Sequence, residues 1–394
     1  MYPSLFLICF FISTALFLNS CGRFILKDDG VEKKSIEELS GVSSARTNLD
    51  GLKTEIFEIT QTVGSDGFLD GFFVVPEDGV SFLLSIFLGS NSSIKFYSLT
   101  DPDGTDILSD SSNLYDASSG NIGTPGYANV LVPQSPDFSA KAGTWTFKAK
   151  SNDRVSIALR TGSTPSAATI TIQPYITGTT WSAGDISAAL SVMSGIYSAN
   201  GITLTINDTI TISDTQYAVV SGTFFNSTTS ALVSQGSTDT VNLFFIEDYC
   251  FSSPCSWSGI LGNAAGIPGS MGTANSWNGV LISLSAHDVS GNTLDSQLLG
   301  ETAAHEMGHQ LGLFHTTEAG GTEFDIISDT AECPKSSRDN DNNSQMSAEE
   351  CDGYGAGNVM FWTAWSSSSR SAGKKQEALS SYQQQVLKYS PLAK

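Results

Sequence analysis

Three histidines and one glutamate lie close together in the string HEMGHQLGLFH, which begins at His305. The surrounding residues predict a helix on which His305 and His309 are four positions apart, so both imidazoles project from one face towards a single tetrahedral zinc ion. Glu306 lies about 100° further round the helix, where it can reach a metal-bound water as general base. Gly312 allows a sharp turn that can return His315 to the same ion. The sequence therefore predicts a zinc site with a carboxylate beside it.

This string matches the metzincin signature in every specified position, and the chain therefore resembles that group of zinc peptidases. The resemblance implies peptide-bond hydrolysis, in which zinc polarises the scissile carbonyl and activates a water while Glu306 transfers its proton to the leaving amine. It also implies a methionine turn, for which GAGNVMFW offers Met360 as an apolar floor beneath the histidines. The remaining histidine, His287, ends a predicted strand and is expected to be structural or at the surface.

Among metzincins the chain most resembles the bacterial pappalysin-like (cytophagalysin-type) peptidases, in which an aspartate-rich segment follows the third histidine. That segment here contains Thr316, Asp325, Asp329 and Cys333. The chain departs from several metzincins two residues after the turn methionine, where a tyrosine is replaced by Trp362, which offers an N–H donor but no phenolate. Oxyanion stabilisation is then expected from the zinc or from another donor, for which Tyr354 is a candidate.

A second metal signal lies in the loop DNDNNSQMSAEE, which resembles an EF-hand calcium loop. Its candidate ligands are Asp339, Asp341, Asn343, Gln345, Ser347 and Glu350. The sixth position is Ser344 instead of the usual glycine, and no pair of flanking helices is evident. The alternative is a solvated acidic loop. Asp325 and Asp329 are candidates for a further calcium ion.

The elements around the histidines alternate between strand and helix. A strand over 168–176, a helical stripe from Ile186 to Tyr197, a stop at Asn200-Gly201 and a strand over 202–206 predict a parallel pair joined by a right-handed crossover. Further strands are expected over 217–222, 241–247 and 279–285. The last of them is expected to be the edge strand along which a substrate aligns. Helices are expected over 295–313 and 379–389. Residues 166–394 are therefore predicted to form an α+β zinc peptidase domain of metzincin type.

Residues 51–162 have a different texture, with short strands separated by Gly, Asp, Asn and Pro clusters. Strands are expected over 72–75, 80–88, 93–99, 127–132, 144–150 and 154–160. This pattern predicts an antiparallel β-sandwich, and the pieces DPDGT and AGTWTF resemble jelly-roll accessory modules of secreted bacterial proteases. The chain is thus expected to be multidomain. If the enzyme is made latent, an aspartate or the N-terminal domain is expected to block it, with cleavage near Arg154 or Arg160.

The first residues form an export segment. Residues 1–21 hold an apolar run from Leu5 to Leu18 that ends in Cys21, which resembles a lipobox with Cys21 as the lipidated residue; a plain signal peptide and a retained membrane helix are the alternatives. Residues 22–50 are polar and are expected to be a tether. The chain is therefore predicted to be secreted or held on the outer surface or outer membrane of a bacterium, with membrane contact only through a lipid anchor.

Four cysteines remain beyond the export segment, and an even number in an exported chain predicts disulfides. Sequence order favours Cys250–Cys255 and Cys333–Cys351; a four-cysteine zinc site is the alternative. The net charge of −21 argues against nucleic acid as a partner. The expected function is a zinc-dependent endopeptidase acting on extracellular proteins or peptides. The alternatives are an inactive surface adhesin that binds matrix or host components through the β-sandwich, and a zinc hydrolase of glycans or other non-peptide substrates.

Overall fold

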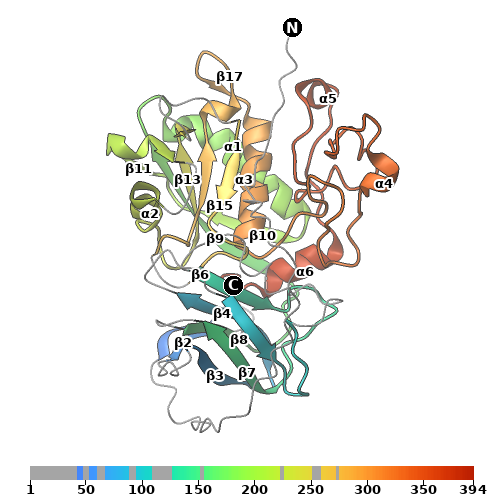
Figure 1. Ribbon diagram of the computed structural model, residues 1–394. Coiled ribbons are helices and arrows are strands. Elements are labelled where there is room, and N and C mark those ends of the chain that lie inside the picture. The colour runs from blue at the N-terminus through green and yellow to red at the C-terminus, as the bar shows by residue number, and fades with distance from the viewer. Residues whose placement is uncertain are drawn as a thin grey trace.

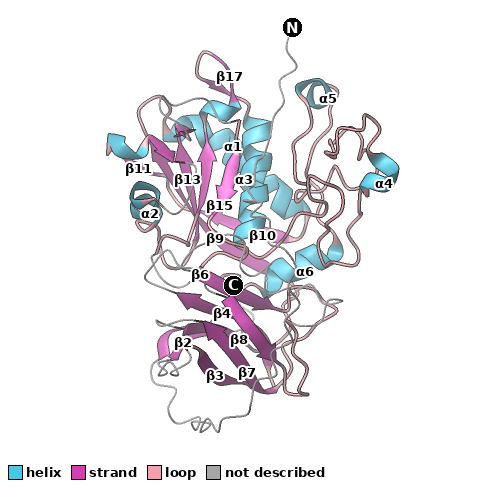
Figure 2. Cartoon of the chain, in the orientation of Figure 1, coloured by secondary structure: helices cyan, strands magenta, loops and turns pink. Residues whose placement is uncertain are grey.

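A computed structural model describes residues 42–47, 53–59, 67–87, 95–108, 127–150, 155–221, 226–250, 259–271 and 275–394. Two regions follow each other along the chain, an all-β region up to residue 161 and a mixed region of strands and helices after it (Figures 1 and 2). The predicted export segment and Arg154 lie outside the described residues. None of the described helices is long and apolar enough to cross a membrane.

The all-β region consists of two antiparallel sheets that share one apolar core. Their strand orders are β1-β2-β8-β4-β6 and β3-β7-β5. The strands are β1 Val42–Thr47, β2 Lys53–Ile59, β3 Leu69–Val75, β4 Gly79–Phe87, β5 Lys95–Thr100, β6 Tyr127–Val132, β7 Gly143–Lys150 and β8 Val155–Thr161. Alternate residues of β3 are buried, as expected for a strand with one face on a core. Phe73, Phe82 and Trp145 pack ring against ring between the sheets.

Two strands of this region, β1 and β2, were not among the expected ones. Residues 42–47 form β1 within the stretch predicted to be a tether, and they pair with β2 in antiparallel register. The segment VSSART has too few apolar residues to show a strand period, so its structure depends on the partner strand and could not be inferred from its own sequence.

The mixed region is built on a sheet of order β10-β9-β13-β16-β15, with β11 also pairing β9. The strands are β9 Ala168–Thr177, β10 Ile202–Ile206, β11 Ile210–Ile212, β13 Val241–Ile246, β15 Gly262–Ala264 and β16 Val280–Ser283. The pairs are parallel except for β15 with β16. The parallel pairing of β9 with β10 is confirmed. Every residue of β13 is buried, because a parallel strand in the middle of a covered sheet has no solvent face.

The predicted edge strand was wrong. Residues 280–283 form β16, which is paired on both sides, and the terminal strand of the described sheet is β15. β15 has three residues, GNA, and runs antiparallel to its neighbour. A segment this short and this poor in apolar residues does not predict a strand from sequence.

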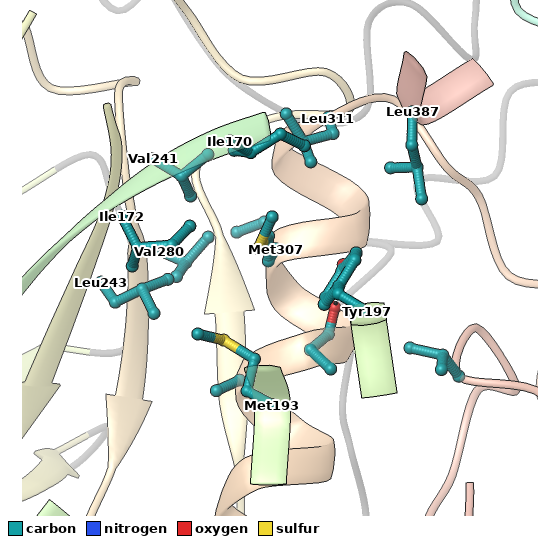
Figure 3. Packing of buried hydrophobic residues seen from close by; sticks show 14 of the residues in the cluster. Ile170, Ile172, Met193, Tyr197, Val241, Leu243, Val280, Met307, Leu311 and Leu387 are labelled. Carbon is teal, nitrogen blue, oxygen red and sulfur yellow. Dashed lines mark hydrogen bonds between the residues drawn. The ribbon is translucent and has the colours of Figure 1, made fainter. Parts of the chain in front are cut away.

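Two long helices, α1 Ala183–Ala199 and α3 Ser296–Gln310, pack on each other and on the sheet. A capping box of Ser182 with Asp185 starts α1, and the Asn200 cap ends it as predicted. The Tyr197 hydroxyl donates to the Ala304 carbonyl at 2.9 Å, which ties the two helices together. Figure 3 shows the apolar contacts between helices and strands, made by Ile170, Ile172, Met193, Tyr197, Val241, Leu243, Val280, Met307 and Leu311.

The remaining elements are short. They are β12 Val219–Ser221, α2 Ser227–Val233, β14 Asp248–Cys250, β17 Asp288–Ser290, β18 Thr293–Leu294, α4 Lys335–Arg338, α5 Ser367–Ser371 and α6 Ser381–Tyr389. After α3 the chain forms long loops stabilised by a small core around Cys333, Met346, Cys351 and Trp362. This part of the chain faces α3 and carries the methionine turn.

The two regions share an interface at the end of the chain, which lies between them (Figure 1). Arg160 of β8 is fully buried there and donates to the carbonyl oxygens of Lys388 at 2.6 Å and Ser390 at 2.7 Å. Ser81 of β4 donates to the Tyr389 carbonyl at 2.6 Å. Arg160 itself is shielded in this fold, whereas residues 163 and 164 just beyond it are exposed, so cleavage near Arg160 stays a prediction. The burial of Arg160 follows from main-chain acceptors that are distant in sequence.

Candidate metal centre

The three histidines converge on one point. The Asp295 side chain caps the start of α3 by accepting from Leu298 N–H at 3.0 Å, and α3 carries His305 and His309. The chain leaves α3 through Gly312, whose φ of +108° favours glycine. This bend returns His315, whose Nε2 atom lies 3.2 Å from Nε2 of His305 and 3.1 Å from Nε2 of His309.

The far side of each imidazole ring is held by an acceptor. Nδ1 of His305 lies 2.7 Å from the Val359 carbonyl, Nδ1 of His309 lies 2.7 Å from the Leu313 carbonyl, and Nδ1 of His315 lies 3.0 Å from the Glu318 carboxylate. Carbonyl and carboxylate oxygens can only accept, so each Nδ1 carries the proton and each Nε2 presents a lone pair. Such outer partners fix the tautomer and orientation of metal-binding histidines.

The electrostatics of the three rings suit a cation. Burial and the neighbouring His315 lower the pKa of His305 to about 3, and burial with both neighbours lowers the pKa of His309 well below its usual value. His305 and His309 are therefore neutral near pH 7. Three imidazoles whose Nε2 atoms converge on one point form a donor set that suits zinc. The residues present thus fit the predicted metal.

Glu306 lies beside this point on the side that faces β15. Its side chain is 1% exposed, and the Ala264 N–H of β15 donates a hydrogen bond to its carboxylate. Burial raises the pKa of Glu306 to about 8. In the absence of a metal this carboxyl is therefore mostly protonated at pH 7, and a nearby cation favours its charged form.

The methionine turn supports the histidines from below. The Val359 carbonyl accepts from His305, and the Met360 carbonyl accepts from Thr316 N–H at 3.0 Å. Met360 is fully buried, and a side chain at Gly308 of α3 would collide with its sulfur atom. The methionine turn therefore contacts both parts of the histidine motif, the helix α3 and the segment with His315 and Thr316 that follows it.

Trp362 and Tyr354 lie in the loops beyond the turn. The Trp362 indole N–H donates to the Met346 carbonyl at 2.5 Å, and the ring belongs to the small core around the disulfide. The Tyr354 side chain is 40% exposed, and its ring lies under the Arg338 guanidinium. These contacts give Trp362 a packing role and do not support Tyr354 as an oxyanion donor.

His287 is structural and is not at the surface. It is 2% exposed, its Nδ1 atom lies 2.6 Å from the Ser283 carbonyl, and its Nε2 atom lies 2.9 Å from the Thr302 hydroxyl. Burial lowers its pKa to about 4. His287 therefore stays neutral and links β16 to α3.

The acidic loop brings Asp339, Asp341 and Glu350 together, with one oxygen of each within 4.8 Å of the others. Asn343 N–H and its side chain donate to Asp341, and the Ser347 hydroxyl donates to Glu350 at 2.8 Å. Ser344 has a φ of +67°, so the sixth position adopts the conformation for which glycine is usual. In the described part of the chain, Asp325 and Asp329 belong to neither cluster of three or more metal-binding side chains.

The cysteines fall into two groups. Cys333 and Cys351 form a disulfide between fully buried residues. Cys250 is also disulfide-bonded, and its predicted partner Cys255 lies outside the described residues.

The sequence analysis missed the acceptors behind the histidines, which are Leu313, Val359 and Glu318. Two of them act through main-chain carbonyls, which carry no sequence signal. Glu318 lies three positions after His315 and was visible as a carboxylate near a predicted ligand, but its direction depends on the turn that closes at Gly321.

One family model covers the part of the chain that holds the histidines. Residues 183–316, from α1 to just beyond His315, match the model of the reprolysin-like metallopeptidases of family M12B. No curated protein matches the chain significantly. Similar solved structures include mature mirolysin from Tannerella forsythia in complex with a cleaved peptide, with 17% identity, a TM-score of 0.36, and coverage of 57% of this chain and 92% of that one.

Two further structures are similar over part of the chain. Archaemetzincin from Archaeoglobus fulgidus with malonate has 15% identity, a TM-score of 0.27, and coverage of 54% of this chain and 96% of that one. Metalloproteinase-II from Bacteroides fragilis has 14% identity, a TM-score of 0.26, and coverage of 43% and 54%. The matched span contains His305, Glu306, His309 and His315, so over residues 183–316 the chain is similar to the reprolysin-like metallopeptidases.

Proposed function

We propose that the chain is an exported, zinc-dependent endopeptidase that hydrolyses peptide bonds of extracellular proteins. The observation that carries this proposal is the convergence of three imidazoles, with each Nδ1 atom held by an oxygen and each Nε2 directed to one point. Within the metzincins we propose the pappalysin-like type, on the aspartate-rich segment after His315. We propose export with lipidation at Cys21, on the sequence of residues 1–21 alone.

Zinc bound by His305, His309 and His315 would polarise the scissile carbonyl and lower the pKa of a water molecule. Glu306 would accept a proton from that water and deliver it to the leaving amine, and burial raises the proton affinity of its carboxylate for this transfer. Met360 supports the histidines without coordinating. Oxyanion stabilisation falls to the zinc, because Trp362 has a packing role.

We place the substrate along β15. This strand is terminal in the described sheet and pairs with β16 on its other side, so an extended peptide can add to it by main-chain hydrogen bonds. Glu306 receives the Ala264 N–H of this strand, which would bring a peptide bond beside the carboxylate.

A quenched-peptide assay with measurement of bound metal tests this function. We expect one zinc ion per chain, cleavage that a chelator abolishes, and restoration by added Zn²⁺. Glu306→Gln should keep the zinc and lose cleavage. A protein that binds no zinc, or that cleaves peptides equally well with chelator, would refute the proposal; zinc binding without peptide cleavage would favour an adhesin or a non-peptide hydrolase.

We also propose that the loop from Asp339 to Glu350 binds calcium. The grouped carboxylates and the φ of Ser344 support this proposal, and Gln345 would contribute its carbonyl. Calcium should raise the melting temperature of the wild type, and Glu350→Gln should remove this increase. The exposed Glu332→Gln is the matched control, in which the increase should remain. A melting temperature that does not respond to calcium in the wild type would contradict the site.

A further inference from the structure

The bend after α3 sets the position of two metal ligands. Leu313 N–H donates to the Gly308 carbonyl, and the Leu313 carbonyl lies 2.7 Å from Nδ1 of His309. The chain reaches His315 two residues later. A displacement of Gly312 would therefore move the acceptor behind one ligand and the backbone of the other.

The all-β region with its two sheets, called the sandwich below, contacts this bend directly. Leu131 of β6 is fully buried, and its Cδ2 atom lies 2.8 Å from the position that a Cβ atom at Gly312 would occupy. Gln134, just beyond β6, is 5% exposed and donates from Nε2 to the Gly312 carbonyl at 3.4 Å. Side-chain packing and a hydrogen bond from the sandwich thus meet at one residue of the metallopeptidase domain.

A second contact from β6 reaches the end of α3 through a loop. Asn129 donates from Nδ2 to the Pro268 carbonyl, and the next residue, Gly269, donates from its N–H to the Gln310 carbonyl at 3.0 Å. Gln310 is the last residue of α3 and donates in turn to the Ser270 carbonyl at 3.2 Å. The strand β6 therefore holds the last turn of α3 from two sides.

We propose that the sandwich positions the metal ligands, with Leu131 and Gln134 as the positioning residues that act on His309 and His315 through the Gly312 bend. This inference rests on the proposed metal site and adds that residues outside the metallopeptidase domain determine its geometry. The sandwich then helps to set the geometry of the metal centre, in addition to any binding role of its own.

The sheet offers a matched control for this proposal. Leu83 of β4 lies opposite Leu131 in the register of β4 with β6, is 2% exposed, and belongs to the same apolar cluster. Leu131 lies among the nearest neighbours of Gly312, whereas Leu83 does not. Alanine at either position removes the same side chain from the same core, but only one change reaches the bend.

The test uses the full chain and compares Leu131→Ala, Leu83→Ala and Leu131→Met. The measurements are Zn²⁺ affinity by competition with a chelating dye, the visible spectrum of the Co²⁺-substituted protein, and kcat and KM on a quenched peptide. Leu131→Ala should let the bend shift and so displace the Leu313 carbonyl behind His309. Loss of such an outer partner weakens metal binding by about 10- to 100-fold, and the cobalt spectrum should change with it. Leu83→Ala should stay within about twofold of the wild type, and Leu131→Met should restore most of the affinity because it keeps the side-chain volume.

A second variant covers the case in which Leu131→Ala does not fold. Gln134→Met keeps the shape of the side chain and should weaken zinc binding by about fivefold, as expected for one hydrogen bond; wild-type affinity in this variant would overturn the inference. Equal zinc affinities and cobalt spectra for Leu131→Ala and Leu83→Ala would overturn it too, and would leave the proposed function intact. A wild-type protein that takes up no zinc would overturn both.

Discussion

Glutamine in place of Glu306 should stabilise the metal-free protein while it removes catalysis. The Glu306 side chain is 1% exposed, and burial raises its pKa from 4.5 to about 8. Between these values the folded protein holds a proton that the unfolded chain has released. The stability associated with this group is therefore complete below about pH 4.5 and is lost as the pH rises through 8.

The expected magnitude follows from this difference in pKa. One pKa unit corresponds to about 1.4 kcal/mol. Relative to a neutral side chain, Glu306 therefore lowers the free energy of unfolding of the metal-free wild type by about 3 kcal/mol at pH 7 and by about 4 to 5 kcal/mol above pH 8. Glutamine has nearly the same shape and no charge to bury. In the presence of a chelator, the variant should therefore be more stable than the wild type by these amounts, and by less than about 1 kcal/mol at pH 5.

Guanidinium denaturation at pH 5, 7 and 8.5 measures the difference in the free energy of unfolding. The depressed pKa values of His305 and His309 affect both proteins equally and cancel in the comparison. The exposed Glu323→Gln serves as control and should follow the wild type at every pH. With zinc bound, cleavage by Glu306→Gln should fall by at least about 10²-fold, the usual contribution of a general base. Parallel stability profiles for wild type and Glu306→Gln would refute the burial argument, and wild-type turnover would refute the catalytic role.

Three further predictions concern the surroundings of the metal site. Glu318→Gln weakens the acceptor behind His315 and should lower zinc affinity by about 10- to 100-fold in a dye competition; unchanged affinity would show that the contact is incidental. Gly312→Ala forces a side chain onto a φ of +108° and against Leu131, and should destabilise the protein by about 1 to 3 kcal/mol in thermal denaturation, a loss that a wild-type melting temperature would exclude. Replacing Cys333 and Cys351 by serine together should cost about 3 kcal/mol, because the disulfide closes a loop with a sequence separation of 18; equal stability of the variant and the oxidised wild type would contradict this estimate.

Local patterns predicted the elements that carry the site. The helix α1, its Asn200 stop and the strand β10 follow from apolar spacing and cap chemistry, and the structure has them at Ala183–Ala199 and Ile202–Ile206. The histidine motif was readable because a single helix and one turn place all three rings, so short-range geometry was enough. The parallel pairing of β9 with β10 then followed from the order strand, helix, strand.

Features that depend on contacts between distant parts of the chain could not be predicted from the sequence. The strand β15 has three residues and exists through its pairing with β16, so the edge of the sheet was assigned to the wrong strand. Trp362 was judged by its place in a family pattern, yet its indole is committed to the Met346 carbonyl. The burial of Arg160 could not be inferred from its own segment, because two of its acceptors lie 228 and 230 residues away in sequence.

The contact between Arg160 and residues 388–390 has a consequence for biosynthesis. Two acceptors of this guanidinium lie 228 and 230 residues further along the chain, so a growing polypeptide has made α1, α3 and the histidine motif before they emerge. Burial of the guanidinium becomes more favourable once these carbonyls are present, because a buried arginine needs acceptors. The sheet that carries Arg160 is therefore expected to complete its packing after residue 390 has been added.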